Sequence, residues 1–427
     1  MPQPLPPAGS SAGHAAGRPA GPADGGSTAT DRERIAADLR AEARRLGFSR
    51  IGIAPAVPPP RQELVRQWLA RGLAGAVEAW FARQVELRSD PGNLLSGARS
   101  VVMLATDHAT AAGAGQGGGP VSDAAESVSA AGPSGRPGYG RIARYAWGDD
   151  YHDILRERVN RLAAWLEGQA PGCRSRGVVD SAPLAEREFA WLAGLGWFGK
   201  NTMLIDPAAG SYFFLTALVT DLDLPVDTPV EVDHCGTCTA CLDACPTQAF
   251  VEPRVLDAGR CISGLTIEEH GSVAAELRRG MGDWVFGCDI CQEVCRWNRR
   301  APGSAEPAFQ PRGGAETLPL ADLLGLDERR FRERFKGTPL VRAKRRGLLR
   351  SAAIALGNLP DPAALPALVA AAGDVEPVVR TAAAWALGRW LAVEPLAADA
   401  RAALEARLAV EADDEVRREL AEALARG

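Results

Sequence analysis

Apolar residues in the first half of the chain follow two spacings, and each spacing predicts a different element. Thr30 and Glu33 form a capping box, and Ile35, Leu39 and Leu46 follow at the intervals of one helical face. Further helices are expected over residues 61–83, 150–166 and 184–193. Short apolar runs predict strands at residues 50–54, 100–105, 177–180 and 212–220. Mixed helices and strands of this kind predict an α/β or α+β domain over residues 30–228.

Two stretches have too few large apolar residues to form a core. Residues 1–29 are mostly Pro, Gly, Ala and Ser and carry two charges. Residues 109–138 contain Val121 and Val128 as their only large apolar side chains. Such segments cannot bury enough apolar surface to offset the entropy that is lost on folding. We therefore predict a disordered tail at 1–29 and a disordered insertion at 109–138.

The pattern changes again near the C-terminus, where one sequence motif occurs a second time about one repeat length later. Leu-Leu-Arg-Ser-Ala-Ala followed by Ala-Leu-Gly occupies residues 348–357, and Val-Val-Arg-Thr-Ala-Ala followed by Ala-Leu-Gly occupies 378–388. A degenerate third copy begins near Val416. This repetition predicts HEAT-like helical repeats over residues 338–427, preceded by a linker and basic segment at 301–337. An ordinary Ala-rich helical bundle is the alternative.

The overall composition is that of a globular protein with several cores. The chain has 427 residues, 46% of them hydrophobic, and a net charge of −5. Because the net charge is negative, any attraction to nucleic acid must come from a local patch. There is no apolar run long enough to span a bilayer and no leader with a basic and then an apolar part. We therefore expect a cytoplasmic protein that does not contact membranes.

The cysteines carry the clearest chemical signal in the chain. Eight of the nine lie between Cys235 and Cys295, and Cys173 lies apart. A dense cysteine block in a large chain without an export signal indicates metal binding rather than disulfides. The spacing that begins at Cys235, C-x2-C-x2-C-x3-C-P, is that of bacterial ferredoxins, in which the fourth cysteine binds the other of two clusters.

This crossover predicts a ferredoxin-like module with two [4Fe–4S] clusters over residues 229–300. The two expected ligand sets are Cys235, Cys238, Cys241 and Cys295 for one cluster, and Cys245, Cys261, Cys288 and Cys291 for the other. One departure from the ferredoxin pattern is Arg296, which stands where a proline normally follows the last cysteine. Structural zinc is the alternative, but it uses CxxC pairs separated by wider gaps.

Two polar residues of the first domain are candidates for chemistry. Asp180 ends an apolar strand and precedes a turn, where α/β proteins collect functional groups. From the residues alone, it fits better as the N-cap of the helix expected at 184–193. His152 follows Asp150 in the first turn of a predicted helix, in a partial match to a cobalamin-ligand motif whose glycine position is occupied by Leu155. We therefore interpret His152 as a helix-surface or core histidine.

A basic segment lies at the start of the helical repeats. Residues 327–350 contain ten Lys and Arg against three acids. A positive cluster on a helical solenoid suits contact with a phosphate backbone. The residues we expect to bind RNA are Arg342, Lys344, Arg345, Arg346 and Arg350. The alternative is an ordinary solvated face.

Several motifs together resemble the epoxyqueuosine reductases, the cobalamin- and iron–sulfur-dependent enzymes of the last step of queuosine biosynthesis in tRNA. The resemblance runs from about Asp31 to the C-terminus. The motifs that carry it are Arg88-x-x-Pro91, Trp147-Gly148-x-Asp150-Tyr151-His152, Val179-Asp180, Lys200-Asn201, Arg260-Cys261-Ile262-Ser263, Gly287-Cys288-Asp289-Ile290-Cys291 and Ala355-Leu356-Gly357-Asn358. The tail, the insertion at 109–138 and Arg296 depart from the family pattern.

The resemblance implies an oxidoreductase with a cobalamin-binding domain at 30–228. We expect the protein to be a monomer. It implies that Asp180 is the proton donor and that Arg88, Ser263 and Asp289 lie against cobalamin, held base-off without a histidine ligand. An unidentified low-potential donor would feed electrons through the clusters to Co(I) cobalamin, which would open the epoxide of a tRNA that carries epoxyqueuosine. As a general acid, Asp180 should have a pKa raised by burial.

Two other functions remain open on the sequence alone. One is a related cobalamin and iron–sulfur reductase, such as a reductive dehalogenase, although those enzymes usually carry export signals and have no reason for a basic helical repeat. The other is a non-enzymatic electron-transfer ferredoxin with a protein-docking solenoid, which would hold no corrinoid.

Overall fold

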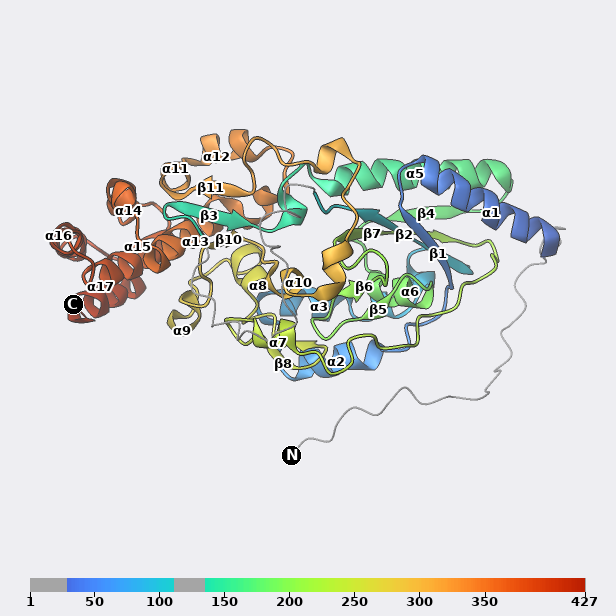
Figure 1. Ribbon diagram of the computed structural model, residues 1–427, viewed down its shortest axis with the longest axis horizontal. Coiled ribbons are helices and arrows are strands. Elements are labelled where there is room, and N and C mark those ends of the chain that lie inside the picture. Colours follow the sequence, from blue (N-terminus) through green and yellow to red (C-terminus); the bar gives the residue numbers. More distant parts are fainter. Residues whose placement is uncertain (1–28, 111–134, 427) are drawn as a thin grey trace, which may run out of the picture.

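The computed structural model describes residues 29–110 and 135–426 (Figure 1). The tail predicted at 1–29 and most of the insertion predicted at 109–138 lie outside these residues. Within the described ranges, no helix is long and apolar enough to cross a membrane.

An antiparallel sheet forms the centre of the N-terminal half. Its strands, in spatial order, are β1 (Arg50–Pro55), β2 (Ser100–Asp107), β7 (Phe213–Thr220) and β4 (Ser175–Val178), and every neighbouring pair is antiparallel. An α/β domain would have a parallel sheet, so the α/β description is wrong and the domain is α+β. The apolar runs revealed that these strands are buried, but burial does not specify the direction of the neighbouring strand.

Both faces of this sheet are covered by helices, as Figure 1 shows. Along β2, Val102 and Leu104 pack with α1 (Ala29–Arg45) and α5 (Tyr151–Gln169) on one face. Val101 and Met103 point the other way, toward α6 (Glu186–Leu192). This alternation is the period of two that an extended strand imposes on its side chains. The first turn of α5 and the loop between β4 and α6 meet at one end of the sheet, through His152 and Asp180.

The helix predicted at 61–83 is interrupted. Gly72 and Gly75 have φ angles of 68° and 54°, which end the first helix and start a short connection. The resulting elements are α2 (Gln62–Ala70), η1 (Gly75–Val77) and α3 (Glu78–Gln84). The other short elements of this half are η2 (Leu87–Ser89), η3 (Pro91–Asn93), η4 (Arg144–Ala146), β5 (Trp197–Phe198) and β6 (Leu204–Ile205).

A second sheet connects the two halves of the chain. Its central strand, β3 (Tyr139–Ile142), pairs in parallel with β10 (Trp284–Phe286) and antiparallel with β11 (Thr317–Pro319). The remaining elements of the cysteine block are α7 (Ala240–Asp243), β8 (Phe250–Glu252), β9 (Val255–Leu256), α8 (Ile262–Ile267), α9 (Ala275–Arg278), α10 (Ile290–Glu293) and η5 (Arg296–Arg300).

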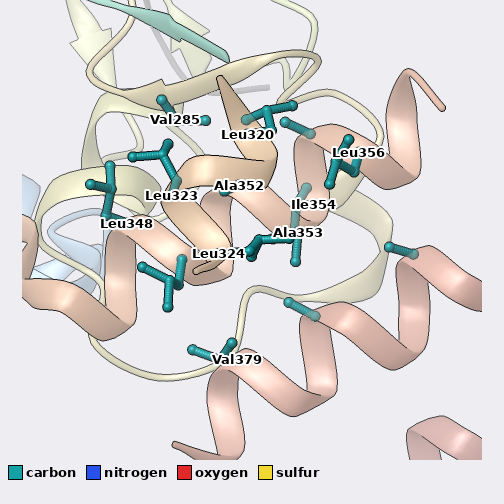
Figure 2. Close-up of a cluster of buried hydrophobic side chains, with 14 of the residues drawn as sticks. Val285, Leu320, Leu323, Leu324, Leu348, Ala352, Ala353, Ile354, Leu356 and Val379 are labelled. Carbon is teal, nitrogen blue, oxygen red and sulfur yellow. The ribbon is translucent and has the colours of Figure 1, made fainter. Parts of the chain in front are cut away.

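The cysteine block and the C-terminal helices share one hydrophobic core. Figure 2 shows Val285 of β10 and Leu320 and Leu323 of α11 (Leu320–Leu324) facing Leu348 and Ala352 of α13 (Lys344–Asn358). The stretch 301–337, which we expected to be a linker, also contributes apolar side chains from α12 (Glu328–Phe335) to this core. The C-terminal helices are therefore packed directly on the cysteine block.

The repeated Ala-Leu-Gly motif of the C-terminal region has a packing explanation. A Cβ atom on Gly357 would lie 2.4 Å from the Trp385 ring, and one on Gly388 would lie 2.6 Å from the Ala423 Cβ. Each glycine therefore lets two helices approach closely at the same position of successive repeats. The helices and turns that complete this region are η6 (Pro307–Phe309), η7 (Pro339–Ala343), η8 (Pro362–Ala364), α14 (Leu365–Ala371), α15 (Pro377–Trp390), α16 (Ala397–Leu408) and α17 (Asp414–Arg426).

Candidate active site

The structure brings four distant cysteines together around one recess. Cys235, Cys238, Cys241 and Cys295 all line it, beside Lys200 and Trp297. Burial, followed by the nearby thiolates of Cys235 and Cys295, raises the pKa of Cys241 to about 11. These four are the residues that the ferredoxin spacing predicts for one cluster.

A second group of cysteines lies deeper, next to the shared core. Burial raises the pKa of Cys291, and the charges of Cys261 and Cys245 raise it further. Burial also raises the pKa of Cys288, which faces Cys261 and Cys291. These are the four residues predicted for the other cluster. Cys173 belongs to neither group, because it packs against the core below α1 and α5.

The grouping differs from that of a site for a single ion. Among the described residues, no three His, Cys, Asp or Glu side chains are close enough together to hold one metal ion. The first four cysteines instead surround an open recess. A group larger than one ion, such as an iron–sulfur cubane, suits this arrangement.

Asp180 is not a helix cap. Helix α6 begins at Glu186, and its N-cap residue, Ala185, makes no side-chain cap hydrogen bond. The Asp180 Oδ2 atom instead lies 3.0 Å from His152 Nε2 and accepts a hydrogen bond from the Tyr151 hydroxyl at 3.3 Å. The cap interpretation is therefore wrong, and the carboxyl group faces the N-terminal end of α5.

The loop that carries Asp180 has an unusual backbone. Asp180 has a φ of 45°, in the left-handed region that few residues other than glycine adopt. Its backbone N–H donates a hydrogen bond of 2.8 Å to Glu186 Oε1. This bond ties the loop to the first residue of α6 and fixes the direction of the Asp180 side chain.

His152 is bound on both sides by carboxylates, which the sequence analysis missed. Its Nδ1 lies 2.7 Å from Asp150 Oδ1, and its Nε2 faces Asp180. Burial alone would lower the pKa of His152, but the hydrogen bonds and charges of Asp150 and Asp180 raise it to about 9. His152 is therefore an imidazolium at neutral pH. The Asp-Tyr-His triplet was a signal, but the contact with Asp180 depends on the tertiary fold.

The pKa of Asp180 moves in the direction opposite to our expectation. Burial raises it, but the hydrogen bond and charge of His152, followed by the charge of Arg342, lower it to below its usual value. Arg342 Nη1 lies 3.6 Å from Asp180 Oδ2. At neutral pH the proton of the pair therefore resides on His152, while Asp180 is a carboxylate.

A partly buried tyrosine, Tyr145, lies between this pair and the deeper cysteines. Burial raises the pKa of Tyr145, whose hydroxyl faces the charges of Arg342, Asp180, Glu268 and Asp289. Asp289 follows Cys288 and immediately precedes α10. It is 3% exposed and accepts a hydrogen bond of 2.7 Å from the Arg144 backbone N–H. Burial raises the pKa of Asp289 to about 6.

The other two residues predicted to contact a cofactor, Arg88 and Ser263, lie on different elements. Burial lowers the pKa of Arg88, which faces Glu186 and Asp180 and donates a hydrogen bond of 2.7 Å to the Leu184 carbonyl. Ser263 lies in the first turn of α8. Burial raises the pKa of the Cys261 thiol, and the backbone N–H groups of Gly264 and Ser263 partly offset that rise.

The basic segment divides into buried and exposed residues. Arg350 is 1% exposed and donates hydrogen bonds to the carbonyl oxygens of Glu269, Gly271 and Leu265. The side chain of Arg345 is 11% exposed and pairs with Asp374 through both terminal nitrogens. The expectation that Arg350 and Arg345 contact RNA is therefore corrected, because their guanidinium groups hold the repeats to neighbouring segments.

The other three basic residues keep free surface. Lys344 is exposed. The side chain of Arg346 is 35% exposed, with its nearest acidic partner, Glu376, 3.9 Å away. Arg342 is 51% exposed and pairs with Glu268 at 2.9 Å, close to Asp180. These three residues connect the outer surface to the region around Asp180.

Three family models match successive parts of the chain. The family described as epoxyqueuosine reductase QueG, DUF1730, matches residues 88–181. The 4Fe-4S double cluster binding domain matches residues 234–298, and the HEAT repeats match residues 340–425. The double-cluster module and the HEAT-like repeats predicted from the sequence are thereby confirmed.

Whole-chain relatives agree with these matches. An epoxyqueuosine reductase of Xanthomonas campestris pv. campestris is 40% identical over 83% of this chain and 96% of its own length. A crystal structure of epoxyqueuosine reductase with an epoxyqueuosine-modified tRNA-Tyr stem loop is 31% identical and has a TM-score of 0.79, covering 92% of this chain and 98% of that one.

A Bacillus subtilis epoxyqueuosine reductase, solved with its aspartate-bearing catalytic loop swung out of the active site, is 30% identical and also has a TM-score of 0.79, over 92% of this chain and 99% of that one. Sequence identity, coverage and fold lead to one conclusion: the chain belongs to the epoxyqueuosine reductase family.

Proposed function

We propose that this protein reduces epoxyqueuosine to queuosine in tRNA. The observation that carries the proposal is that Tyr145 faces both Asp180, paired with His152, and Asp289, beside the deeper cysteines. A source of protons and a source of electrons therefore border the same region. The reaction needs both, since the epoxide takes up two electrons and two protons and becomes an alkene and water. The family membership and the relative bound to a modified stem loop support this reaction.

The two cysteine groups would bind the clusters that deliver the electrons. The proposed ligands are Cys235, Cys238, Cys241 and Cys295 for the first cluster, and Cys245, Cys261, Cys288 and Cys291 for the second. The first group lies at an open recess and the second lies against Asp289. Electrons would therefore enter at the first cluster and leave from the second toward the active site.

The residues around Tyr145 fit a bound cobalamin. Arg88 Nε is buried and has no hydrogen-bond partner among the described residues, so it can hold a polar group of the corrinoid. Asp289 and Ser263 would contact the corrinoid from the side of the second cluster. Both ring nitrogens of His152 are engaged by carboxylates, which agrees with binding without a histidine ligand. When bound, cobalamin supplies the strong nucleophile that a strained epoxide carbon requires.

Asp180 would act as the general acid, with His152 as its proton reservoir. As the epoxide opens, the proton of His152 Nε2–H would pass to the Asp180 carboxylate and from there to the departing oxygen. Asp150 would orient the imidazole through Nδ1 and stabilise its charged form. The loop of Asp180 must be held in place for this, and the hydrogen bond between its N–H and Glu186 serves that purpose.

Arg342, Lys344 and Arg346 would guide the tRNA to this region. Their exposed positive charges can contact phosphates, and Arg342 links that surface to Asp180. Positioning contacts of this kind need no base specificity, because the wobble base itself would be recognised inside the site.

Replacing Cys295 tests the assignment of the cluster ligands. Cys295→Ser should damage or remove the cluster built on Cys235, Cys238 and Cys241 and leave the other intact. Cys173→Ser, the matched control, should keep about eight irons per chain, as two cubanes require. Iron analysis and electron paramagnetic resonance of the reduced protein would measure both. Two intact clusters in Cys295→Ser would overturn the crossover.

The charged state of His152 can be measured by NMR titration of histidine-labelled protein. The imidazole should titrate near pH 9, and Asp180→Asn should shift its pKa down toward the ordinary value of about 6.5. Because the pKa is raised in the folded protein, the pair contributes stability that is full below about pH 6.5 and is lost as the pH rises through about 9. A wild-type His152 that titrates near 6.5 would contradict the pairing.

Turnover of Asp180→Asn tests the general acid. The amide cannot donate the proton, so turnover of epoxyqueuosine tRNA should fall by about a hundredfold or more. Asp153→Asn, which removes an exposed carboxylate next to His152 in α5, should turn over normally. Iron and cobalamin contents must match wild type in both variants. A loss smaller than about threefold in Asp180→Asn would rule out the assignment.

Charge reversal of Lys344 and Arg346 tests the RNA surface. The double variant Lys344→Glu/Arg346→Glu should weaken tRNA binding and reduce its dependence on salt, since fewer counterions are released. Arg401→Glu/Arg418→Glu, on α16 and α17, makes the same change of charge and should bind normally. The affinities are measured from binding curves at two salt concentrations. If Lys344→Glu/Arg346→Glu binds as tightly as wild type at both, this surface is an ordinary solvated face.

A further inference from the structure

The first cysteine group differs from the second in its access to solvent. Cys238 is the exposed member of the eight cysteines of the block, and its group lines an open recess. In the second group, Cys288 packs against the hydrophobic core that the cysteine block shares with the C-terminal helices. A protein that delivers electrons can therefore approach the first group much more closely than the second.

The surface around the first cysteine group, which we call the rim, carries four cations. Arg296, Arg299 and Arg300 of η5 directly follow Cys295 and are all exposed. In the part of the chain that the structure describes, none of the three has an acidic partner within ion-pair distance. Lys200 adds a fourth cation, and its Nζ donates hydrogen bonds of 2.7 Å and 2.9 Å to the carbonyls of Gly236 and Cys238.

Acidic residues near the rim neutralise little of this charge. Asp233 already pairs with Arg254 at 2.5 Å, and Glu293 lies 3.8 Å from Arg141. Asp243 is exposed and accepts a hydrogen bond from the Thr239 hydroxyl. The rim is therefore positive on balance in a chain whose net charge is −5.

The segment that carries these arginines is rigidly attached. The Trp297 ring packs edge-on against Trp197, with the ring centres 5.0 Å apart. The Asn298 side chain accepts a hydrogen bond of 2.6 Å from the Ser211 N–H and donates one of 2.8 Å to the Gln292 carbonyl. The arginines of η5 thus project from a fixed platform beside Cys295.

We propose that η5, Lys200 and the exposed edge of the first cysteine group form the docking surface for an acidic one-electron carrier protein. The inference rests on the proposed function for the identity of the cluster and names the class of its unknown donor. One electron would pass from the reduced carrier to the first cluster, with no transfer of a proton or group. Complementary charge speeds such encounters by steering, and electron-transfer partners typically use small, transient interfaces.

Arg296 would contribute to this docking surface. A proline normally follows the last cysteine of the ferredoxin pattern, and here an exposed arginine takes its place. That substitution adds a positive charge directly beside the ligand Cys295. The rim is favoured as a protein site rather than an RNA site because its charge lies beside the recess of the first cysteine group, where electrons would enter.

The test is the rate at which a reduced carrier transfers its electron to the holoenzyme. A small acidic [2Fe–2S] ferredoxin, reduced beforehand, is mixed with holoenzyme, and cluster reduction is followed by stopped-flow absorbance at two ionic strengths. The wild-type rate should fall as salt increases. Arg299→Glu/Arg300→Glu should slow transfer at low salt by about tenfold or more and remove the salt dependence, within the range that steering provides. Arg401→Glu/Arg418→Glu should behave as wild type.

Two results would overturn the proposal. One is a rate and salt dependence in Arg299→Glu/Arg300→Glu equal to those of wild type. The other is a loss of tRNA affinity in that variant with unchanged electron transfer, which would make the rim an RNA surface. Turnover of epoxyqueuosine tRNA with a chemical reductant reports on the proposed function separately, because it bypasses the carrier. Failure of that assay in wild type would count against the function and not against the docking surface.

Discussion

The parallel pairing of β3 with β10 is the constraint on which the rest of the site depends. The Ala143 N–H donates a hydrogen bond of 2.9 Å to the Phe286 carbonyl, and the next N–H, that of Arg144, reaches the Asp289 carboxylate. Beyond β3 the chain leads to Tyr145 and then to α5 with His152, and beyond β10 it leads to Cys288 and Asp289. One short strand pair therefore sets the proton-carrying residues against the deeper cysteines. Burial of β10 in the shared core makes this pairing rigid.

Charge pairing within the site decides which group holds the proton. Two carboxylates flank one imidazole, so the charged form of His152 is favoured even though burial opposes it. The same interaction keeps Asp180 ionised at rest. In the proposed reaction, Asp180 would therefore act through its partner, because His152 would supply the proton that the carboxylate passes on. Burial would make an isolated aspartate a ready acid, but here the combined effects of His152, Arg342 and Tyr151 on the pKa outweigh it.

The arginines of the C-terminal repeats show how one residue type serves two purposes. Arg350 and Arg380 occupy equivalent positions of successive repeats, and both donate hydrogen bonds to backbone carbonyls of neighbouring segments. Buried guanidinium groups need such partners, since leaving them unpaired costs free energy. Lys344 is exposed, and Arg346 is partly exposed, in the first turn of α13. The repeat architecture thus uses some cations for packing between segments and leaves others exposed on the surface.

Much of this protein was determined by patterns that are local in the sequence. The cysteine spacing predicted which four thiols line the recess beside Lys200 and Trp297, because covalent spacing limits which thiols can surround one cluster. The Ala-Leu-Gly repetition predicted the HEAT-like repeats, and apolar periodicity located the main helices and strands. Tertiary structure alone decided the antiparallel direction of the central sheet, the pairing of His152 with Asp180 and the burial of Arg350. Each of these depends on contacts between segments far apart in the chain, where hydrogen-bond partners and solvent exposure are set by packing rather than by neighbouring residues.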